Sequence, residues 1–197
     1  MRIPHPFRRI YSGVIDLAER RLPTLALPRT VYSTPYTSVE ERRARFGAIA
    51  VLAGPRGGQI TGAAALLRSG DQLLLTRETR YGTRTQLVQT PGGAVDTGEL
   101  PEIAAARELA EESGYAVTGV GVELGVIYPY APYVDARTHL YFFRDDAAAA
   151  TTEPCGELDE VLWASIEEAV LAAVDGTIRC ATTTALILRA HARGLLD

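Results

Sequence analysis

The feature that most constrains this chain is a glycine pair followed by a helix that carries three acids on one face. Pro101 suits the first turn of a helix, and Gly114 suits the position just past its end. At about 100° per residue, Glu108, Glu111 and Glu112 fall within an arc of roughly 100°. The opposite side is apolar, with Ile103, Ala105, Ala106, Leu109 and Ala110. Unpaired carboxylates this close repel one another, so the sequence predicts a group that compensates them.

A hard divalent cation would compensate the acidic face, because Mg²⁺ accepts carboxylate oxygens and keeps positions open for phosphate oxygens and water. A face that is simply solvated is the alternative. The residues that flank the helix favour the cation. From Gly93 the chain has five residues, Glu99, seven residues, Arg107-Glu108-Leu109, one residue, Glu111-Glu112, one residue and Gly114-Tyr115. Seven identities at this fixed spacing would occur by chance at roughly one in 10⁹ positions.

This pattern resembles the Nudix box at every charged and glycine position, with Tyr115 where the family more often has an aliphatic residue. The resemblance implies the Nudix fold, an α+β class (α/β/α sandwich) with a mixed sheet between helices. It also implies hydrolysis of a nucleoside diphosphate linked to another group, with Mg²⁺ as cofactor and Mn²⁺ as the alternative. Metal ions would neutralise the diphosphate and lower the pKa of the attacking water.

The resemblance assigns roles within the box. The implied metal ligands are the carbonyl oxygen of Gly92 and the carboxylates of Glu108, Glu111 and Glu112. Glycines at 92 and 93 let the backbone pass close to a metal. Arg107 lies at the edge of the acidic arc, so we expect it to orient Glu99 or Glu111 rather than to contact substrate.

From about residue 34 to the carboxyl terminus the chain is similar to ADP-ribose and sugar-nucleotide pyrophosphatases. The similar segments are Thr76-Arg77-Glu78-Thr79-Arg80-Tyr81, Gln89-Thr90-Pro91-Gly92-Gly93 and Asp175-Gly176-Thr177-Ile178. The similarity implies that Arg80 binds the diphosphate, for which a forked guanidinium is suited, and it adds Arg77 as a candidate. A surface arginine at a strand end is the alternative. Gln89 departs from the usual Glu, so we expect base recognition to differ.

Two further substrate-site predictions concern loops. Pro129 and Pro132 bracket the downstream proline typical of the ADP-ribose group, or they only shape a turn. The family's catalytic base often comes from a loop before the late strand, and that loop here contains Glu153, Glu157, Asp159 and Glu160. Glu157 aligns best by its distance from the strand expected at 161–164, and the other acids of the loop remain alternatives.

Composition excludes several other functions. All 20 basic residues are Arg, which excludes a Schiff-base lysine and a P-loop lysine. Cys155 and Cys180 are too few for a zinc cluster or a disulfide framework, and neither lies near the box, as an isopentenyl diphosphate isomerase would require. No Gly-x-Ser-x-Gly motif is present. The open alternatives are a nucleotide sensor that does not cleave and a nucleoside triphosphate pyrophosphatase.

We expect an N-terminal extension over 1–47 and a Nudix domain over 48–197. Residues 1–45 hold nine Arg and four acids, a local charge of 9 − 4 = +5. Nucleic-acid binding is unfavoured, because the aromatic and glycine patterns of RNA-binding modules are missing. Residues 31–46 resemble the entry strands with which related pyrophosphatases form homodimers, so we expect a dimerisation arm. We expect Cys155 and Cys180 to be free thiols in a reducing cytoplasm. No apolar run approaches the roughly 18 residues of a membrane span, so we expect no membrane contact.

Periodicity and turn residues predict the remaining elements. We expect strands at 60–67, 72–76, 86–89, 115–128, 138–143 and 161–164, helices at 101–113, 166–174 and 181–191, and a mobile loop at 147–152.

Overall fold

The computed structural model describes residues 27–44, 47–153 and 158–197, which form two β-sheets and three α-helices. The smaller sheet contains β1 (Arg29–Ser33), β2 (Ser38–Ala44) and β3 (Gly47–Ala53). The larger contains β4 (Ile60–Ser69), β5 (Gln72–Arg80), β6 (Thr85–Gln89), β7 (Gly92–Ala94), β8 (Val122–Ile127), β9 (Ala136–Arg144) and β10 (Glu160–Ser165). The helices are α1 (Pro101–Ser113), α2 (Ile166–Asp175) and α3 (Ala181–Ala192), with a 3₁₀ turn at η2 (Pro55–Gly57). No described helix is long and apolar enough to cross a bilayer.

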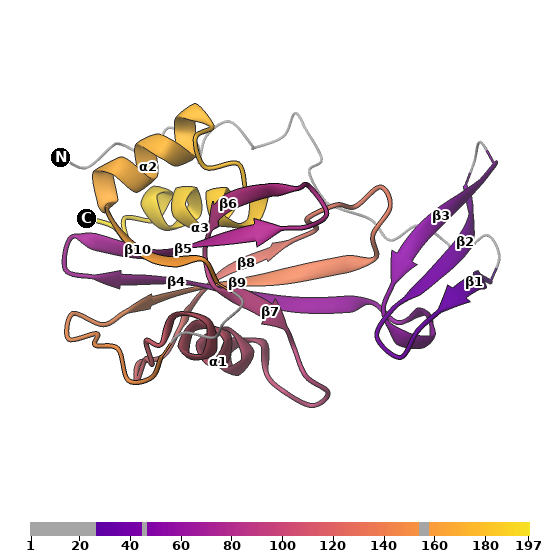
Figure 1. Ribbon diagram of the computed structural model, residues 1–197, viewed down its shortest axis with the longest axis horizontal. Helices are drawn as coiled ribbons and strands as arrows, with labels where there is room; N and C mark the ends of the chain where they lie inside the picture. Colours follow the sequence, from indigo (N-terminus) through magenta and orange to yellow (C-terminus); the bar gives the residue numbers. More distant parts are fainter. Residues whose placement is uncertain (1–26, 45–46, 154–157) are drawn as a thin grey trace, which may run out of the picture.

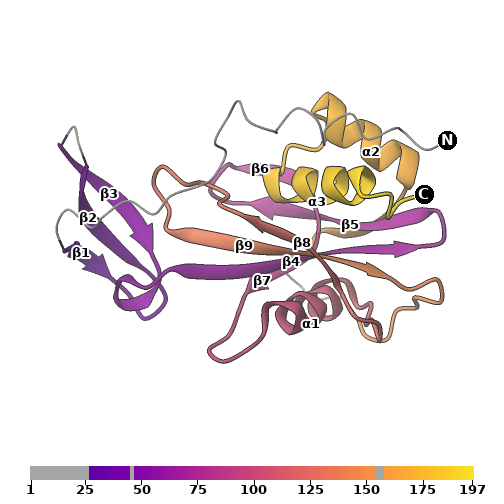
Figure 2. The same cartoon turned by 180° about the vertical axis from the view of Figure 1, so that it is seen from behind.

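The large sheet is mixed and lies between helices. Its strands follow the order β10-β5-β4-β9-β8, in which β4 and β9 are parallel and the other neighbours are antiparallel. Helix α1 covers one face, and α2 and α3 cover the other (Figures 1 and 2). Central strands that are covered on both faces need continuous apolar sequence, and β4 is apolar and buried from 63 to 67. The predicted α+β sandwich is confirmed.

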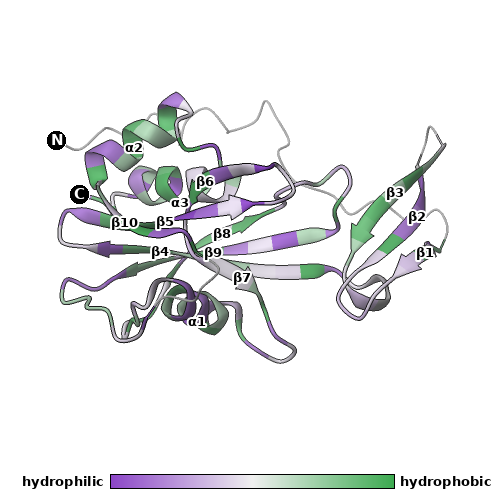
Figure 3. Cartoon of the chain, viewed as in Figure 1, coloured by the Kyte–Doolittle hydropathy of each residue, from purple (hydrophilic) through white to green (hydrophobic). Residues whose placement is uncertain are grey.

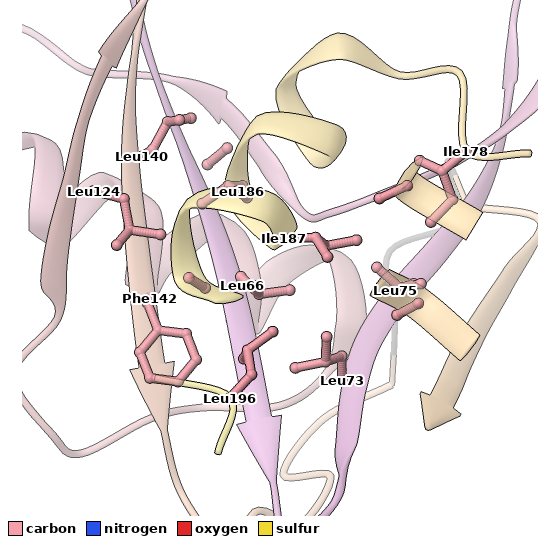
Figure 4. Close-up of a cluster of buried hydrophobic side chains, with 14 residues drawn as sticks. Leu66, Leu73, Leu75, Leu124, Leu140, Phe142, Ile178, Leu186, Ile187 and Leu196 are labelled. Carbon is pink, nitrogen blue, oxygen red and sulfur yellow. The ribbon is translucent and has the colours of Figure 1, made fainter. Parts of the chain in front are cut away.

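Two apolar clusters hold these layers together. On the α3 side, Leu186 and Ile187 pack in one cluster with Leu66 of β4, Leu75 of β5 and Leu140 of β9 (Figure 4). On the α1 side, Leu109 packs with apolar residues of β4, β5 and β9. Each fully buried leucine contributes about 1.5–3 kcal/mol relative to exposure, so the clusters fix the positions of the helices.

Local signals predicted most of these elements, and the differences have physical causes. The strand expected at 115–128 is β8 alone, Val122–Ile127, because the chain bends at the glycines before it. A Cβ on Gly121 would lie 2.9 Å from the Phe143 ring, so only glycine permits this approach. The loop at 147–152 contacts the end of α1, where the Thr151 amide donates to the Gly114 carbonyl at 2.8 Å. Ile103, expected on the buried side of α1, is 56% exposed.

The large sheet divides where β4 changes partners. β4 pairs with β5 only over 67–69, and over 62–64 it pairs with β7 instead. Beyond the residues that pair with β4, β5 pairs with β6 instead, over 76–80. Thr90 and Pro91 alone separate β6 from β7, and the Pro91 carbonyl accepts the Ala65 amide at 2.9 Å. The segment 89–93 therefore crosses this fork and connects the β5–β6 hairpin to the strand beside α1.

The small sheet lies apart from the helices at the end of the long axis (Figure 1). Figure 3 shows its strand β3 as largely hydrophobic, although no described helix covers this sheet. Leu52 of β3 joins it to the loop before β9, because its amide donates to Tyr133 and its carbonyl accepts from Asp135, both at 2.8 Å. Arg42 adds an ion pair to Asp135 at 2.8 Å.

Candidate active site

Helix α1 directs its acids toward β7 because its opposite side is buried. Ala104, Ala105 and Leu109 belong to the cluster beneath the helix, against β4 and β9. Pro101 occupies the first turn, and Gly114 ends the helix in the left-handed conformation with φ 81°. The ends of the helix and its apolar contacts thus fix the rotation that turns Glu108 and Glu112 toward β7.

Glycines in β7 bring the backbone against two of these acids. A Cβ atom on Gly93 would lie 2.5 Å from Cδ of Glu108, closer than real side chains approach. The amide of Gly92 donates to Oε2 of Glu112 at 3.0 Å. A Cβ atom on Gly92 would lie 2.6 Å from the Ala63 carbonyl oxygen. Gly92 is therefore required for the close packing of β4 and β7, whereas a side chain at position 93 would push the Glu108 carboxylate aside.

Arg107 is the centre of the ion pairs on this face. Its Nε and Nη2 donate to the two carboxylate oxygens of Glu99, each at 3.0 Å. Its Nη1 contacts Glu108 at 2.7 Å and Glu111 at 3.0 Å. Nη2 also donates to the Ala94 carbonyl at 3.0 Å, which ties the helix to β7. One guanidinium thus contacts Glu99, Glu108 and Glu111.

Burial and hydrogen bonding shift these carboxylates in opposite directions. Burial raises the pKa of Glu112 to about 7, against the hydrogen bond from Gly92, and the charges of Glu108, Glu78 and Arg80 also act on it. Burial likewise raises the pKa of Glu108. The hydrogen bond from Arg107 lowers the pKa of Glu99. A nearby cation would favour the charged forms of Glu108 and Glu112.

The chemistry of this face fits a hard divalent cation. It offers carboxylate oxygens beside the closely packed backbone of β7, and Mg²⁺ binds oxygen ligands of this kind. Within the described ranges, no three His, Cys, Asp or Glu side chains form a ready metal cluster. Arg107 engages both Glu108 and Glu111, so a cation shared by those two acids would have to displace its Nη1.

A second group of polar side chains lies on the β5–β6 hairpin, and we call it the Arg80 ring. Nε of Arg80 donates to Oε1 of Gln89 at 3.0 Å, and Nη1 contacts Oε1 of Glu78 at 2.7 Å. The Gln89 amide nitrogen donates to the other oxygen of Glu78, which closes the ring. Glu78 and Arg80 alternate with Leu74 on one face of β5, and Leu74 packs in the cluster beneath α1, so the ring lies on the α1 side of the sheet.

The other predicted substrate and base residues are not part of these two groups. Arg77 alternates to the opposite face of β5 from Arg80 and pairs with Glu160 at 3.0 Å. Pro129 lies exposed in the turn between β8 and β9, and no described hydrogen bond links it to the acidic face. Glu157, the predicted base, lies outside the described residues. Asp159, an alternative in the same loop, accepts a hydrogen bond from Thr79 at 2.8 Å.

A cleft of about 650 Å³ lies between the hairpin and this loop. It is lined by Glu78, Thr79, Arg80, Tyr81, Gly82, Leu158 and Asp159. Glu78 belongs to the segment 76–81 that is similar to the pyrophosphatases, but the similarity assigned it no role. Its spacing of two residues from Arg80 was the available signal, because alternate residues of a strand share a face.

Comparisons with known proteins agree with this fold. The NUDIX domain family matches residues 58–182. A GDP-mannose pyrophosphatase of Cronobacter sakazakii is 31% identical over 147 residues, which cover 69% of this chain and 76% of that protein. An ADP-ribose pyrophosphatase of Bacillus subtilis is 28% identical over 112 residues, which cover 56% of this chain and 58% of that protein.

Two further matches show how much of each chain these similarities cover. A CMP-5'-(N-acetyl-N-hydroxy-3-aminopropyl)phosphonate hydrolase of Streptomyces rubellomurinus is 39% identical over 82 residues, 41% of this chain and 39% of that protein. The match thus spans less than two thirds of this relative and of the Bacillus enzyme. A crystal structure of an ADP compounds hydrolase superposes with a TM-score of 0.65 at 18% identity, covering 90% of this chain and 98% of that one, and this likeness shows the fold.

Proposed function

Because the chain belongs to the Nudix family, we propose that it hydrolyses the diphosphate bond of a nucleoside diphosphate linked to another group, with ADP-ribose or a nucleotide sugar as substrate. The observation that carries this proposal is the acidic face of α1 packed against Gly92 and Gly93, with the Arg80 ring on the same side of the sheet. This arrangement places oxygen ligands for a cation beside a guanidinium suited to phosphate oxygens. The box carboxylates are intact, which disfavours a sensor that does not cleave.

Different residues would bind the cation and the substrate. Glu108, Glu112 and the Gly92 carbonyl would hold the cation, with Glu111 binding a further ion or its water. When bound, Mg²⁺, or Mn²⁺ in its place, supplies charge neutralisation and an acidified water. Arg80 would bind the diphosphate from the hairpin.

The remaining roles belong to residues that move protons or orient others. Arg107 would hold Glu99 and Glu111 in place through the contacts that it makes with both. Glu157 is our proposed base, because it aligns best with the family's loop carboxylate. Replacing Glu157 with Gln should lower kcat more than it raises KM, since a base acts on the attacking water. A larger effect at Glu153 or Glu160 would move this role to that residue.

A substrate panel tests the proposed function. ADP-ribose, GDP-mannose, other nucleotide sugars and dinucleoside polyphosphates are incubated with Mg²⁺, with Mn²⁺ and with excess EDTA. We expect metal-dependent release of a nucleoside monophosphate and no activity in EDTA. Glu112→Gln should lose at least about 10²-fold in activity with the fold retained, whereas exposed Glu167→Gln of α2 should not change it. Full activity in EDTA, or in Glu112→Gln, would reject the metal role.

We also propose that residues 1–47 form a dimerisation arm and that the protein is a cytoplasmic homodimer. The small sheet supports this proposal, because the apolar side chains of Val31, Tyr32 and Leu52 are exposed on it. A three-stranded sheet needs a covered apolar face for independent stability. Light scattering on the full chain should give twice the monomer mass, and Val31→Asp should reduce it. A monomeric full chain would contradict the dimer, and salt-dependent binding to random DNA would favour the nucleic-acid alternative.

A further inference from the structure

The three side chains of the Arg80 ring differ sharply in exposure. Gln89 is 3% exposed, the Glu78 side chain is 14% exposed, and the Arg80 side chain is 45% exposed. The two inner residues therefore hold an arginine whose outer part reaches the cleft. Among the described residues, Nη2 of Arg80 has no hydrogen-bond partner, while Nε and Nη1 are both held within the ring.

Strand pairing explains why these residues meet. Glu78 and Arg80 alternate with Thr76 on one face of β5, and Thr76 lies directly opposite Gln89 of β6. Leu74, on the same face, packs in the cluster beneath α1. The ring therefore lies on the side of the sheet that carries the acidic face. Three residues after Gln89, the amide of Gly92 binds Glu112, so one short segment positions both groups.

The chemistry of the ring requires an amide at position 89 while a carboxylate stands at position 78. Gln89 accepts a hydrogen bond from Arg80 and donates one to Glu78 at the same time. An ionised Glu at position 89 could accept but not donate, and it would place two carboxylates together in a buried site. The ring now carries one positive and one negative charge. Glu at position 89 would make its net charge −1, beside a site for anionic phosphate oxygens.

We propose that Glu78 and Gln89 are positioning residues for Arg80, holding two of its guanidinium nitrogens so that Nη2 faces the cleft to receive a diphosphate oxygen. The inference rests on the proposed function, because it concerns the group that binds the same substrate. Gln89 keeps the ring neutral, and Glu78 supplies the single carboxylate that Arg80 needs. The ring therefore acts on the affinity for the diphosphate and leaves the chemical step to the residues of α1 and the base.

A carboxylate–amide exchange tests this ring. The variants are Gln89→Glu and the exchange variant Glu78→Gln/Gln89→Glu. In the exchange variant the amide stands on β5 and the carboxylate on β6. The matched control is Gln72→Glu, the same substitution at the exposed far end of β5, about 25 Å of strand from Arg80. Binding of ADP with Mg²⁺ is measured by calorimetry, KM and kcat are measured on the substrate that the wild type hydrolyses, and thermal unfolding monitors the fold.

We expect Gln89→Glu to weaken ADP binding and raise KM about tenfold, with kcat within about twofold of the wild type. The exchange variant should recover ADP binding to within about threefold of the wild type, and Gln72→Glu should bind as the wild type does. Unchanged ADP binding in Gln89→Glu would overturn the positioning role. An exchange variant that folds but binds ADP tenfold more weakly than the wild type would overturn it as well.

The two readouts separate this inference from the proposed function. If the wild type hydrolyses its substrate but Gln89→Glu binds ADP as tightly as the wild type does, the positioning role is rejected and the proposed activity stands. A wild type that binds ADP but hydrolyses none of the panel rejects the proposed activity, and the ADP titrations of the variants still decide the ring. If Gln89→Glu does not fold, the exchange variant decides, because it must fold and bind ADP to support the ring.

Discussion

Strands β4 and β1 are stabilised in opposite ways. β4 lies between helices and is buried over six consecutive residues, 63–68, whereas all five residues of β1 are exposed. In β4 the burial of apolar surface on both faces provides the free energy and fixes the register. β1 relies on its backbone pairing with β2 and on ion pairs such as Arg29 with Glu41 at 3.0 Å. Exposed pairs of this kind contribute at most about 1 kcal/mol each.

This difference separates stability from function within the chain. The large sheet and its helices carry the cohesive core, and the acidic face uses that core as a rigid support. The small sheet contributes little buried area, and its junction with the domain depends on Leu52 and on the pair between Arg42 and Asp135. Substitutions in the core should therefore change global unfolding, and substitutions at the junction should change local opening.

The largest effect on stability is expected at Leu109, which is fully buried beneath α1. Leu109→Ala should lower the free energy of unfolding by about 2–5 kcal/mol, because it removes apolar contacts and leaves a cavity. Ile103→Ala, on the exposed side of the same helix, is the control and should cost less than about 1 kcal/mol. Urea unfolding measures both. Equal losses in the two variants would show that α1 is not held by the cluster seen here.

Gly93→Ala should show the reverse pattern, with loss of activity and a small loss of stability. Its Cβ would meet the carboxylate end of Glu108, a flexible group that can turn away at little cost to the fold. Displacing a proposed metal ligand by about 1 Å should lower activity by 10- to 10²-fold. Gly119→Ala, where a Cβ meets nothing closer than 3.9 Å, is the control for both measurements. Wild-type activity in Gly93→Ala would contradict the role of this close approach.

Local sequence signals predicted the parts of the site that one helix encodes. Pro101 and Gly114 mark both ends of α1, and helical periodicity placed its three acids together, so the helix follows from short-range chemistry. Periodicity did not decide the exact buried side, because Ile103 and Ala104 are neighbours on the helix and tertiary packing selected Ala104. The resemblance to the Nudix box predicted the fold class, which is confirmed.

Features that depend on pairing between strands could not be predicted in the same way. The Arg80 ring needs the register that sets Thr76 opposite Gln89, and no residue of β5 encodes that register alone. Strand β7 is only three residues long and was not expected, because its residues pair with β4 across the fork. The base in the loop before β10 remains a prediction.

The smallest expected effect is at the junction of the two sheets. Burial alone would raise the pKa of Asp135, but hydrogen bonds from Gln59 and Arg42 outweigh it and lower the pKa below the ordinary value. The lowered pKa means that this carboxylate stabilises the folded state above the ordinary Asp pKa of about 3.9. That contribution is lost as the pH falls through the folded-state pKa.

Asp135→Asn should therefore cost about 0.5–1 kcal/mol at pH 7, and the difference from the wild type should shrink below about pH 4. Because the junction holds β3 through Leu52, the loss should appear first as faster hydrogen exchange of the Leu52 amide, with α1 unchanged. Asp146→Asn, which breaks an exposed pair with Arg144 at the other end of the molecule, is the control and should leave exchange in β3 unaltered. Faster exchange throughout α1 in Asp135→Asn would show that both sheets unfold as one unit. The small sheet would then not open independently of the large one.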